Sequence, residues 1–307
     1  MKDISIIIPV YNESSNITLL YSRLKNVVSQ ITTHYELVFV NDGSRDNSMA
    51  MIKKLSSEDP SVKYIDFSRN FGHQVAVSAG IDLAAGNAMV IIDADLQDPP
   101  ELILEMYKKY KEGNEVVFAK RKTRKGESVF KLLTAKIFYR ILSSITAIDI
   151  PLDTGDFRII DKKIAEVLKQ MPEQEKFLRG QIAWAGFNQT FVEYERNERH
   201  AGKTGYPFKK MLRFALDGIT SFSNFPLKFA TLAGFAVSFV AFILMLYALY
   251  SRFILKDFVQ GWTSLILSVL FIGGIQLICL GIIGEYISRM SNNIRNRPMY
   301  IVKETNI

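Results

Sequence analysis

Asp93 and Asp95, two aspartates separated by one residue, form the strongest candidate for a chemical site in this chain. They follow an apolar run at residues 89–92 that has the length and branching of a buried strand. Ligands of open α/β sheets bind at the carboxyl ends of strands, where paired carboxylates suit a hard divalent cation that also takes phosphate oxygens. Such a pair is also common in solvated turns, so the surrounding elements must decide between the two interpretations.

Strand-like and helix-like segments alternate through the first 120 residues. The expected strands lie at 4–10, 36–40, 62–67, 88–92 and 115–119, and the expected helices at about 16–30, 47–57, 74–85 and 100–111. This alternation predicts an α/β fold with a mostly parallel sheet and helices on both faces. The two aspartates then lie at the carboxyl edge of that sheet.

The C-terminal third contains two apolar stretches, 229–251 and 261–284, that lack Asp, Glu, Lys and Arg. Each is long enough for a helix to cross a hydrocarbon core of about 30 Å. A pair of buried core helices is the alternative, but the glycines of the second stretch suit close packing in lipid. We therefore expect a transmembrane hairpin with helices at about 229–251 and 261–285. The single cysteine, Cys279, lies in the second stretch, so structural disulfides are not expected.

The basic residues indicate how the chain meets the membrane. The net charge of +7 could suit nucleic acid, but many of the cations neighbour apolar, helix-spaced positions, which favours an anionic membrane surface. The pattern at 208–222 predicts an interfacial helix; a similar pattern at 130–145 fits ordinary core packing equally well. The segments before the first span and after the second carry more Lys and Arg than the loop between the spans. This difference predicts that both termini are cytoplasmic. The expected domains are 1–205 for the sheet domain, 206–226 for the interfacial helix, and 227–307 for two spans with a basic tail.

Three motifs carry a family resemblance: IIIPVYNE at 6–13, VNDGSRD at 40–46 and DAD at 93–95. Together they resemble the family 2 glycosyltransferases, which implies a GT-A, Rossmann-like fold. SRNFGH at 68–73, DLQDPP at 95–100, DTGDFR at 153–158 and RHAGKT at 199–204 are similar to motifs of polyprenyl-phosphate glycosyltransferases. With the C-terminal hairpin, the chain most resembles the bactoprenol (undecaprenyl-phosphate) glucosyltransferases. It departs from many of these at Gly205, where a lysine is common.

The resemblance implies a donor site for a UDP-sugar. Asp95, with Asp93 and Gln97, would hold Mg²⁺ or Mn²⁺ beside the diphosphate, where the ion stabilises developing negative charge. The uridine and ribose would contact four further residues, namely Pro9, Tyr11, Glu13 and Asp42. Pro9 and Tyr11 could instead only pack at a strand end, and Asp42 could be only a turn residue.

The acceptor side of the predicted site depends on one carboxylate and two arginines. Asp156 resembles the family's candidate base, but a lipid phosphate is already anionic, so positioning of the acceptor or sugar is an equal alternative. Arg121 and Arg199 could grip the acceptor phosphate, since guanidinium groups bind phosphate oxygens bidentately. Solvated surface arginines are the alternative. His73 and His200 have no metal-ligand partner pattern, so we place both outside the catalytic set.

The expected reaction is inverting transfer of a hexose from a UDP-sugar to undecaprenyl phosphate at the bacterial inner membrane, and glucose is the favoured sugar. Mannose, galactose and amino-arabinose remain alternatives. A processive polysaccharide synthase is less favoured, because its usual Gln-x-x-Arg-Trp is absent at Gln181, where the chain reads QIAW. A non-catalytic membrane scaffold is disfavoured, because it has no need of acidic pairs at strand ends. A transporter is disfavoured, because its spans would contain more polar residues than these do. We also expect a homo-oligomer, with a flippase and a periplasmic glycosyltransferase as partners in O-antigen-type surface modification.

Overall fold

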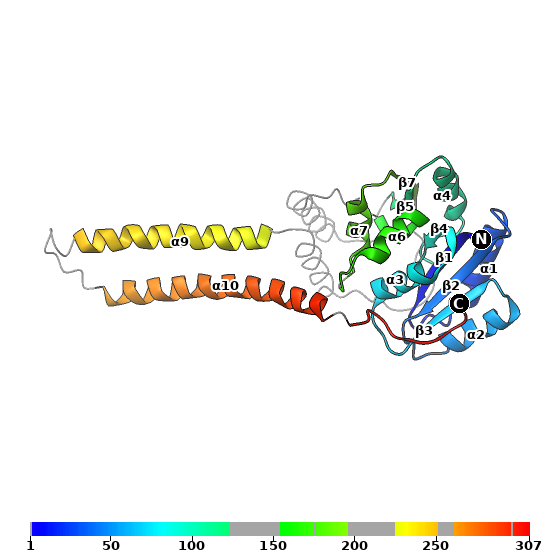
Figure 1. Ribbon diagram of the computed structural model, residues 1–307, viewed down its shortest axis with the longest axis horizontal. Helices are drawn as coiled ribbons and strands as arrows, with labels where there is room; N and C mark the ends of the chain where they lie inside the picture. Colours follow the sequence, from blue (N-terminus) through cyan, green and yellow to red (C-terminus); the bar gives the residue numbers. More distant parts are fainter. Residues whose placement is uncertain (1, 123–153, 175, 196–224, 251–260, 296) are drawn as a thin grey trace. The chain divides into compact units, whose positions relative to one another are not determined.

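The computed structural model describes residues 2–122, 154–174, 176–195, 225–250, 261–295 and 297–307 (Figure 1). The chain divides into two compact units: Met1–Gly218 together with Arg297–Ile307, and Ile219–Asn296. The predicted helix at 208–222, the 130–145 segment, Arg199 and His200 lie outside the described residues.

The first unit is built on one sheet, to which the described residues contribute eight strands in the order β7-β5-β6-β4-β1-β2-β3-β8. Neighbours β1/β2, β1/β4, β2/β3 and β5/β7 are parallel, whereas β6 pairs antiparallel with both β4 and β5, and β8 antiparallel with β3. The strands are β1 (Lys2–Val10), β2 (Tyr35–Asn41), β3 (Val62–Phe67), β4 (Gly86–Ile91), β5 (Val116–Arg121), β6 (Thr154–Asp161), β7 (Gln189–Tyr194) and β8 (Val302–Thr305). The five predicted strands are therefore confirmed, and the sheet is mostly parallel.

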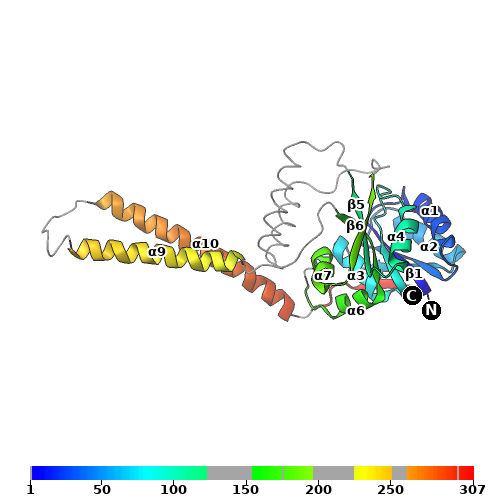
Figure 2. The same ribbon diagram turned by 90° about the horizontal axis from the view of Figure 1, so that it is seen from above.

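Helices cover both faces of this sheet, as the alternation predicted (Figures 1 and 2). One face carries α1 (Ile17–Ser29), α2 (Ser48–Glu58) and α4 (Leu102–Lys111). The other carries α3 (His73–Leu83), α6 (Lys162–Gln170) and α7 (Leu178–Ala185). Side chains of a strand alternate between the two cores, so Ile6 and Ile8 pack with α1 while Ile7 packs with α3.

Close packing of α3 brings its first residues to the carboxyl edge of the sheet. A Cβ added at Gly80 would lie 2.3 Å from Cγ2 of Ile7, so the absent side chain lets α3 lie directly on β1. Gly72, which caps the helix, has φ of 108°, a conformation that glycine adopts without steric cost. His73 follows at the first helical position, near the ends of β1 and β4.

The C-terminal residues differ from the basic tail that we expected. Arg297–Ile307 belongs to the sheet unit, where β8 forms the edge strand beside β3. A strand of only four residues that reads VKET offers neither an apolar run nor a clear alternation, so the sequence pattern did not reveal it. The strands β6 and β7 and the helices α6 and α7 were likewise not assigned from the sequence.

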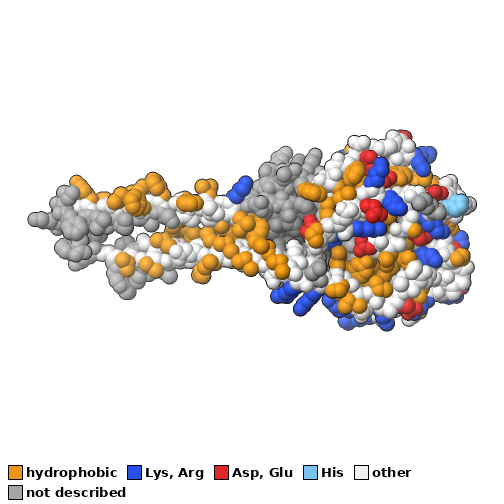
Figure 3. All heavy atoms as spheres, in the orientation of Figure 1, with side chains coloured by type: hydrophobic (Ala, Val, Ile, Leu, Met, Phe, Trp, Pro, Cys, Tyr) orange, Lys and Arg blue, Asp and Glu red, His pale blue; other side chains and the backbone are white. Residues whose placement is uncertain are grey.

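The second unit contains the two helices predicted from the apolar stretches, α9 (Phe225–Tyr250) and α10 (Trp262–Ile294). The latter extends well past residue 285, where we expected its end. Among described residues, Phe271–Ile294 is the segment long and apolar enough to cross a membrane, and Pro226–Val237 is a shorter apolar segment. Exposed apolar side chains cover much of both helices (Figure 3). Among the described residues, an added Cβ at Gly273, Gly274, Gly281 or Gly284 would meet nothing within 4 Å, and the predicted role of these glycines in close helix packing stays a prediction.

Candidate active site

Most of the predicted site residues line one cavity of about 340 Å³ at the carboxyl edge of the sheet. They reach it from the ends of β1, β4 and β5 and from the start of β6. The lining residues are Pro9, Tyr11, Glu13, His73, Asp93, Ala94, Asp95, Arg121, Gly155, Asp156 and Arg179. Parallel strands direct their carboxyl ends to the same edge, which explains why segments distant in sequence meet here.

Asp93 and Asp95 leave β4 into a turn that holds both carboxylates at the cavity. Leu96, with φ of 60°, makes the turn, and the backbone N–H of Gln97 donates to Oδ1 of Asp95 at 3.1 Å. Gln97 thus shapes the turn through its backbone, and its side chain is not among the groups lining the cavity. The predicted role of that side chain as a metal ligand stays a prediction.

Asp93 carries an acceptor atom that the described protein does not satisfy. Its Oδ1 is buried and accepts no hydrogen bond, and Nε2 of His73 lies 3.5 Å away. Burial raises the pKa of Asp93 to about 6, with the charge of His73 acting in the opposite direction and that of Asp156 in the same direction. An acceptor of this kind suits a cation that binds together with a ligand.

The described residues contain no group of three or more His, Cys, Asp or Glu side chains placed to hold a metal ion. Two carboxylates alone fit the way Mg²⁺ and Mn²⁺ are often held, with one or two protein carboxylates, water and substrate phosphate oxygens. The residues present are therefore compatible with an ion that arrives together with a phosphorylated substrate.

Asp156 is the centre of a buried charge network. Its Oδ1 accepts from Nε of Arg179 at 2.9 Å, and its Oδ2 lies 3.1 Å from Nε2 of His73 and accepts from Nε2 of Gln74 at 3.3 Å. Burial acts to raise the pKa of Asp156, but Arg179, His73 and Arg158 outweigh it and hold that pKa well below its usual range. Such a carboxylate stays ionised and is a weak proton acceptor.

His73 lines the cavity together with the predicted site residues, although we had placed it outside the catalytic set. Burial acts to lower the pKa of His73, but Asp93 and Asp156 raise it to about 9, so the imidazole is a cation at neutral pH. The SRNFGH segment, quoted for the family resemblance, was the available signal. The partners of His73 are carboxylates from strands distant in the sequence, which a pattern of metal-ligand spacing does not reveal.

Arg121 lies inside the site and is not a solvated surface residue. Its guanidinium lies over Gly155, where an added Cβ would be 2.9 Å from Nη2. Its Nε donates to the hydroxyl of Tyr194 at 3.3 Å, and that hydroxyl donates to the buried carboxylate of Asp98. These contacts fix the guanidinium at the cavity, where it can meet an anionic group.

Asp42 holds the loop before α3. Its carboxylate accepts from the backbone N–H of Phe71 at 2.6 Å and of Gly72 at 3.0 Å, and from Nδ2 of Asn70 at 2.9 Å. The side chain is buried and is not among the groups lining the cavity. Asp42 therefore positions the segment that presents His73, and its predicted contact with uridine stays a prediction.

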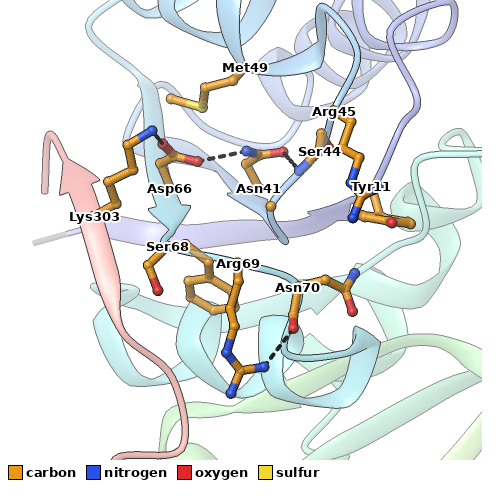
Figure 4. A pocket seen from close by; sticks show the side chains of 12 residues that line it. Tyr11, Asn41, Ser44, Arg45, Met49, Asp66, Ser68, Arg69, Asn70 and Lys303 are labelled. Carbon is orange, nitrogen blue, oxygen red and sulfur yellow. Dashed lines mark hydrogen bonds and ion pairs between the residues drawn. The ribbon is translucent and has the colours of Figure 1, made fainter.

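A second pocket of about 360 Å³ shares Tyr11 with the first (Figure 4). In its lining, Nδ2 of Asn41 donates to Oδ1 of the buried Asp66 at 2.7 Å, and Nζ of Lys303 lies 3.7 Å from Oδ2 of Asp66. The lining residues are Tyr11, Asn41, Gly43, Ser44, Arg45, Met49, Asp66, Phe67, Ser68, Arg69, Asn70 and Lys303. The two pockets give an extended ligand a path along the carboxyl edge of β1 to β4.

Comparison with known proteins agrees with this architecture. The family model described as glycosyl transferase family 2 matches residues 5–168. An uncharacterized glycosyltransferase of Bacillus subtilis (strain 168) is 54% identical over 301 residues, which cover 98% of this chain and 93% of the relative. A prophage bactoprenol glucosyl transferase homolog of Escherichia coli (strain K12) is 40% identical over 300 residues, and the bactoprenol glucosyl transferase of Shigella phage SfII is 38% identical over 302; each alignment covers 98% of both chains.

Among solved structures, glucosyl-3-phosphoglycerate synthase from Mycobacterium tuberculosis aligns with a TM-score of 0.48 and 16% identity, covering 71% of this chain and 78% of its own. The family match spans the strands and turns that form the first cavity, and the relatives align over nearly the whole chain. The protein therefore belongs to glycosyl transferase family 2, and the cavity at the carboxyl edge of its GT-A sheet is the candidate active site of a glycosyltransferase.

Proposed function

We propose that this glycosyltransferase transfers one glucosyl residue from UDP-glucose to undecaprenyl phosphate at the cytoplasmic face of a bacterial inner membrane. The names of the aligned bactoprenol glucosyl transferases support this acceptor and this sugar. The observation that carries the proposal is that one cavity is lined both by the carboxylates of Asp93 and Asp95 and by the guanidinium groups of Arg121 and Arg179. Such a site offers one place for a metal-bound diphosphate and another for an anionic acceptor.

The donor would extend along both pockets, with its diphosphate beside Asp93 and Asp95. A divalent ion, Mg²⁺ or Mn²⁺, would supply the positive charge that stabilises the departing UDP. The exposed ring of Tyr11 lies between the pockets and offers a surface to the nucleoside. Pro9 and Glu13 line the same cavity, in keeping with their expected place near the nucleotide.

The acceptor phosphate would attack the anomeric carbon through one of its oxygens while the bond from that carbon to the UDP oxygen breaks. A phosphate monoester is already anionic at neutral pH, so the attack needs no strong base. The low pKa of Asp156 fits this requirement, because a carboxylate that stays charged keeps Arg179 and His73 in place. Arg121, and Arg199 from outside the described residues, would bind the acceptor phosphate. Attack from the face opposite UDP inverts the configuration and gives a β-linked lipid phosphate sugar.

The second unit would hold the enzyme at the membrane as a hairpin of α9 and α10. The chain leaves the sheet unit before α9 and re-enters it at Arg297, after α10. Two crossings satisfy this connectivity, because they return the chain to the side on which it began. With 206–226 as an interfacial helix, the catalytic unit and both termini would be cytoplasmic. A homo-oligomer, a flippase and a periplasmic glycosyltransferase that uses the lipid-linked sugar for O-antigen-type modification complete the proposal.

A panel of radiolabelled nucleotide sugars tests the reaction. Purified protein, polyprenyl phosphate and Mg²⁺ should convert UDP-glucose into a product that partitions into organic solvent. Label entering that phase only from a mannose or amino-arabinose donor would replace glucose with that sugar, and label entering a polymer would indicate a processive synthase. If all label stays in the water-soluble fraction, lipid phosphate is not the acceptor. The Asp95→Asn variant is the matched control for background hydrolysis.

A further inference from the structure

The C-terminal segment is folded onto the sheet unit through its own specific contacts. The backbone of β8 pairs with β3, and the ring of Tyr300 stacks on Phe67 with centroids 5.2 Å apart. Oδ1 of Asn306 accepts from the backbone N–H of Tyr64 at 2.7 Å, and Glu304 accepts from the Tyr64 hydroxyl at 2.8 Å. A segment held by pairing, stacking and side-chain hydrogen bonds is a structural part of the unit that contains the active site.

A β-bulge directs Lys303 out of the ladder. Thr305 pairs with Ile65, and Glu304 pairs with Asp66. The next residue of β3, Phe67, pairs with Val302, so Lys303 has no partner in the ladder. Regular pairing would place Lys303 opposite Phe67 and on its buried face. The bulge instead puts Val302 against the core and turns the lysine toward Asp66, as Figure 4 shows.

We assign the pocket in Figure 4 to the nucleoside end of a nucleotide because of its place beside the first cavity. Its lining combines the buried carboxylate of Asp66, hydrogen-bonded by Asn41, with the cations Arg45, Arg69 and Lys303. The diphosphate has a place in the neighbouring cavity, beside Asp93 and Asp95. Tyr11, which is 45% exposed, offers a ring face at the junction of the two pockets. A neutral heterocycle with several hydrogen-bonding atoms matches a pocket that offers an aromatic ring, a side-chain amide and charged side chains.

We propose that β8 forms one wall of the nucleoside pocket and that Lys303 is a donor-positioning residue, which neutralises Asp66 and donates a hydrogen bond to an oxygen of the base or ribose. This inference rests on the proposed function in one respect, that the donor is a nucleoside diphosphate sugar. The side chain of Lys303 is 67% exposed, so its ammonium group is accessible to a ligand. Donor binding then depends on residues that follow α10 in the chain.

Calorimetric titration of the full-length protein in detergent, with Mg²⁺, tests the inference with UDP and with uridine. Lys303→Met should weaken binding of both ligands by about tenfold, the scale of one lost charge-assisted hydrogen bond. Lys303→Arg should stay close to wild type. Lys53→Met is the matched control, because Lys53 pairs with Glu304 of the same strand at 2.5 Å but does not line the pocket. All variants should melt within a few degrees of wild type.

A second substitution separates charge neutralisation from general damage. If Lys303 balances Asp66, adding Asp66→Asn to Lys303→Met should recover part of the lost affinity, because the unpaired buried carboxylate is removed. No recovery would overturn the neutralising role.

The outcomes distinguish this inference from the proposed function. A wild type that binds UDP together with a Lys303→Met variant that binds it equally well would overturn the inference alone. Weaker binding of UDP with unchanged binding of uridine would place Lys303 at the phosphates and overturn the nucleoside assignment. A wild type that binds no nucleoside diphosphate would overturn the proposed donor and this inference with it.

Discussion

Charge at the active site is organised around His73, whose imidazole lies between two carboxylates that would otherwise repel each other. Nε2 of His73 is 3.1 Å from Asp156 and 3.5 Å from Asp93. Arg179 contacts Asp156 and leaves Asp93 with no hydrogen bond at Oδ1. The two aspartates therefore differ: Asp156 contacts cations of the protein, and Asp93 keeps an acceptor atom for which we propose a cation that comes with the substrate.

The metal proposal predicts a large effect at Asp95. Asp95→Asn keeps the size of the side chain but removes the charge that a divalent ion needs, so turnover should fall by at least about a hundredfold. Chelation should have the same effect on wild type, and Mg²⁺ or Mn²⁺ should restore activity. Glu101→Gln removes a carboxylate that pairs with Arg23 at 2.6 Å on the surface, and it should leave turnover unchanged. Full activity in chelator would assign another task to the aspartates.

The raised pKa of His73 predicts a pH dependence of stability. The folded pKa of about 9 exceeds the ordinary value of 6.5, so the folded state holds this proton more tightly than the unfolded state. The stabilisation is fully present below about pH 6.5 and is lost as the pH rises through 9. Melting of chelator-treated protein should show this loss, and His73→Gln should flatten the curve in that window. If the stability of wild type and of His73→Gln falls equally with rising pH in that window, groups other than His73 cause the loss.

At the scale of elements, the loop between β3 and α3 sets the position of His73. Asp42 holds its backbone through two N–H groups, and Gly72 gives the chain the conformation that begins the helix. This loop therefore couples the end of β2 to the active site without placing the Asp42 side chain at the cavity.

Gly72→Ala tests that coupling. An added Cβ would meet no atom within 4 Å, so the expected damage comes from backbone strain at φ of 108°. Gly113→Ala is a matched control, since Gly113 has φ of 97°, has open space around it and lies in the turn after α4. Both variants should lose a similar amount of stability, on the order of 1 kcal/mol, but only Gly72→Ala should lower sugar transfer. A comparable activity loss in both would point to general destabilisation.

At the scale of the whole molecule, the sheet unit is assembled from both ends of the chain. The predicted nucleotide motifs all precede residue 100, so the sequence predicts that a chain cut after Asn224 keeps the whole donor site. Such a cut also removes Arg297–Ile307, and with it the partner of β3 and the lysine beside Asp66. The unit of α9 and α10 and the sheet unit are therefore not separable at a single point of the chain.

Two altered proteins test this connectivity. Replacing residues 225–296 with a flexible linker of roughly thirty residues keeps β8, and this protein should bind UDP like the intact enzyme. The cut after Asn224 should bind UDP more weakly. Both should lose transfer to long-chain polyprenyl phosphate, and a short soluble acceptor should restore part of the activity of the linker protein. Undiminished use of the long-chain acceptor by the linker protein would show that the apolar helices serve another purpose, such as assembly with a partner.

The sequence alone determined the features that depend on local pattern. Apolar runs and helical periodicity placed β1 to β5 and their helices, and charge-free stretches placed α9 and α10, because burial imposes these patterns on consecutive residues. The carboxyl-edge position of Asp93, Asp95 and Tyr11 followed from their place at the ends of predicted strands of a mostly parallel sheet.

Only the tertiary structure decided which distant groups meet. His73 and Asp156 are 83 residues apart, and Lys303 reaches Asp66 because β8 pairs with β3 and bulges at one residue. Strand β6 was obscured in the sequence by Arg158, a charged residue that is buried because its guanidinium donates to the carbonyl of Gly155 at 2.8 Å. Pairing between segments far apart along the chain leaves no local periodicity, so these contacts required the folded sheet.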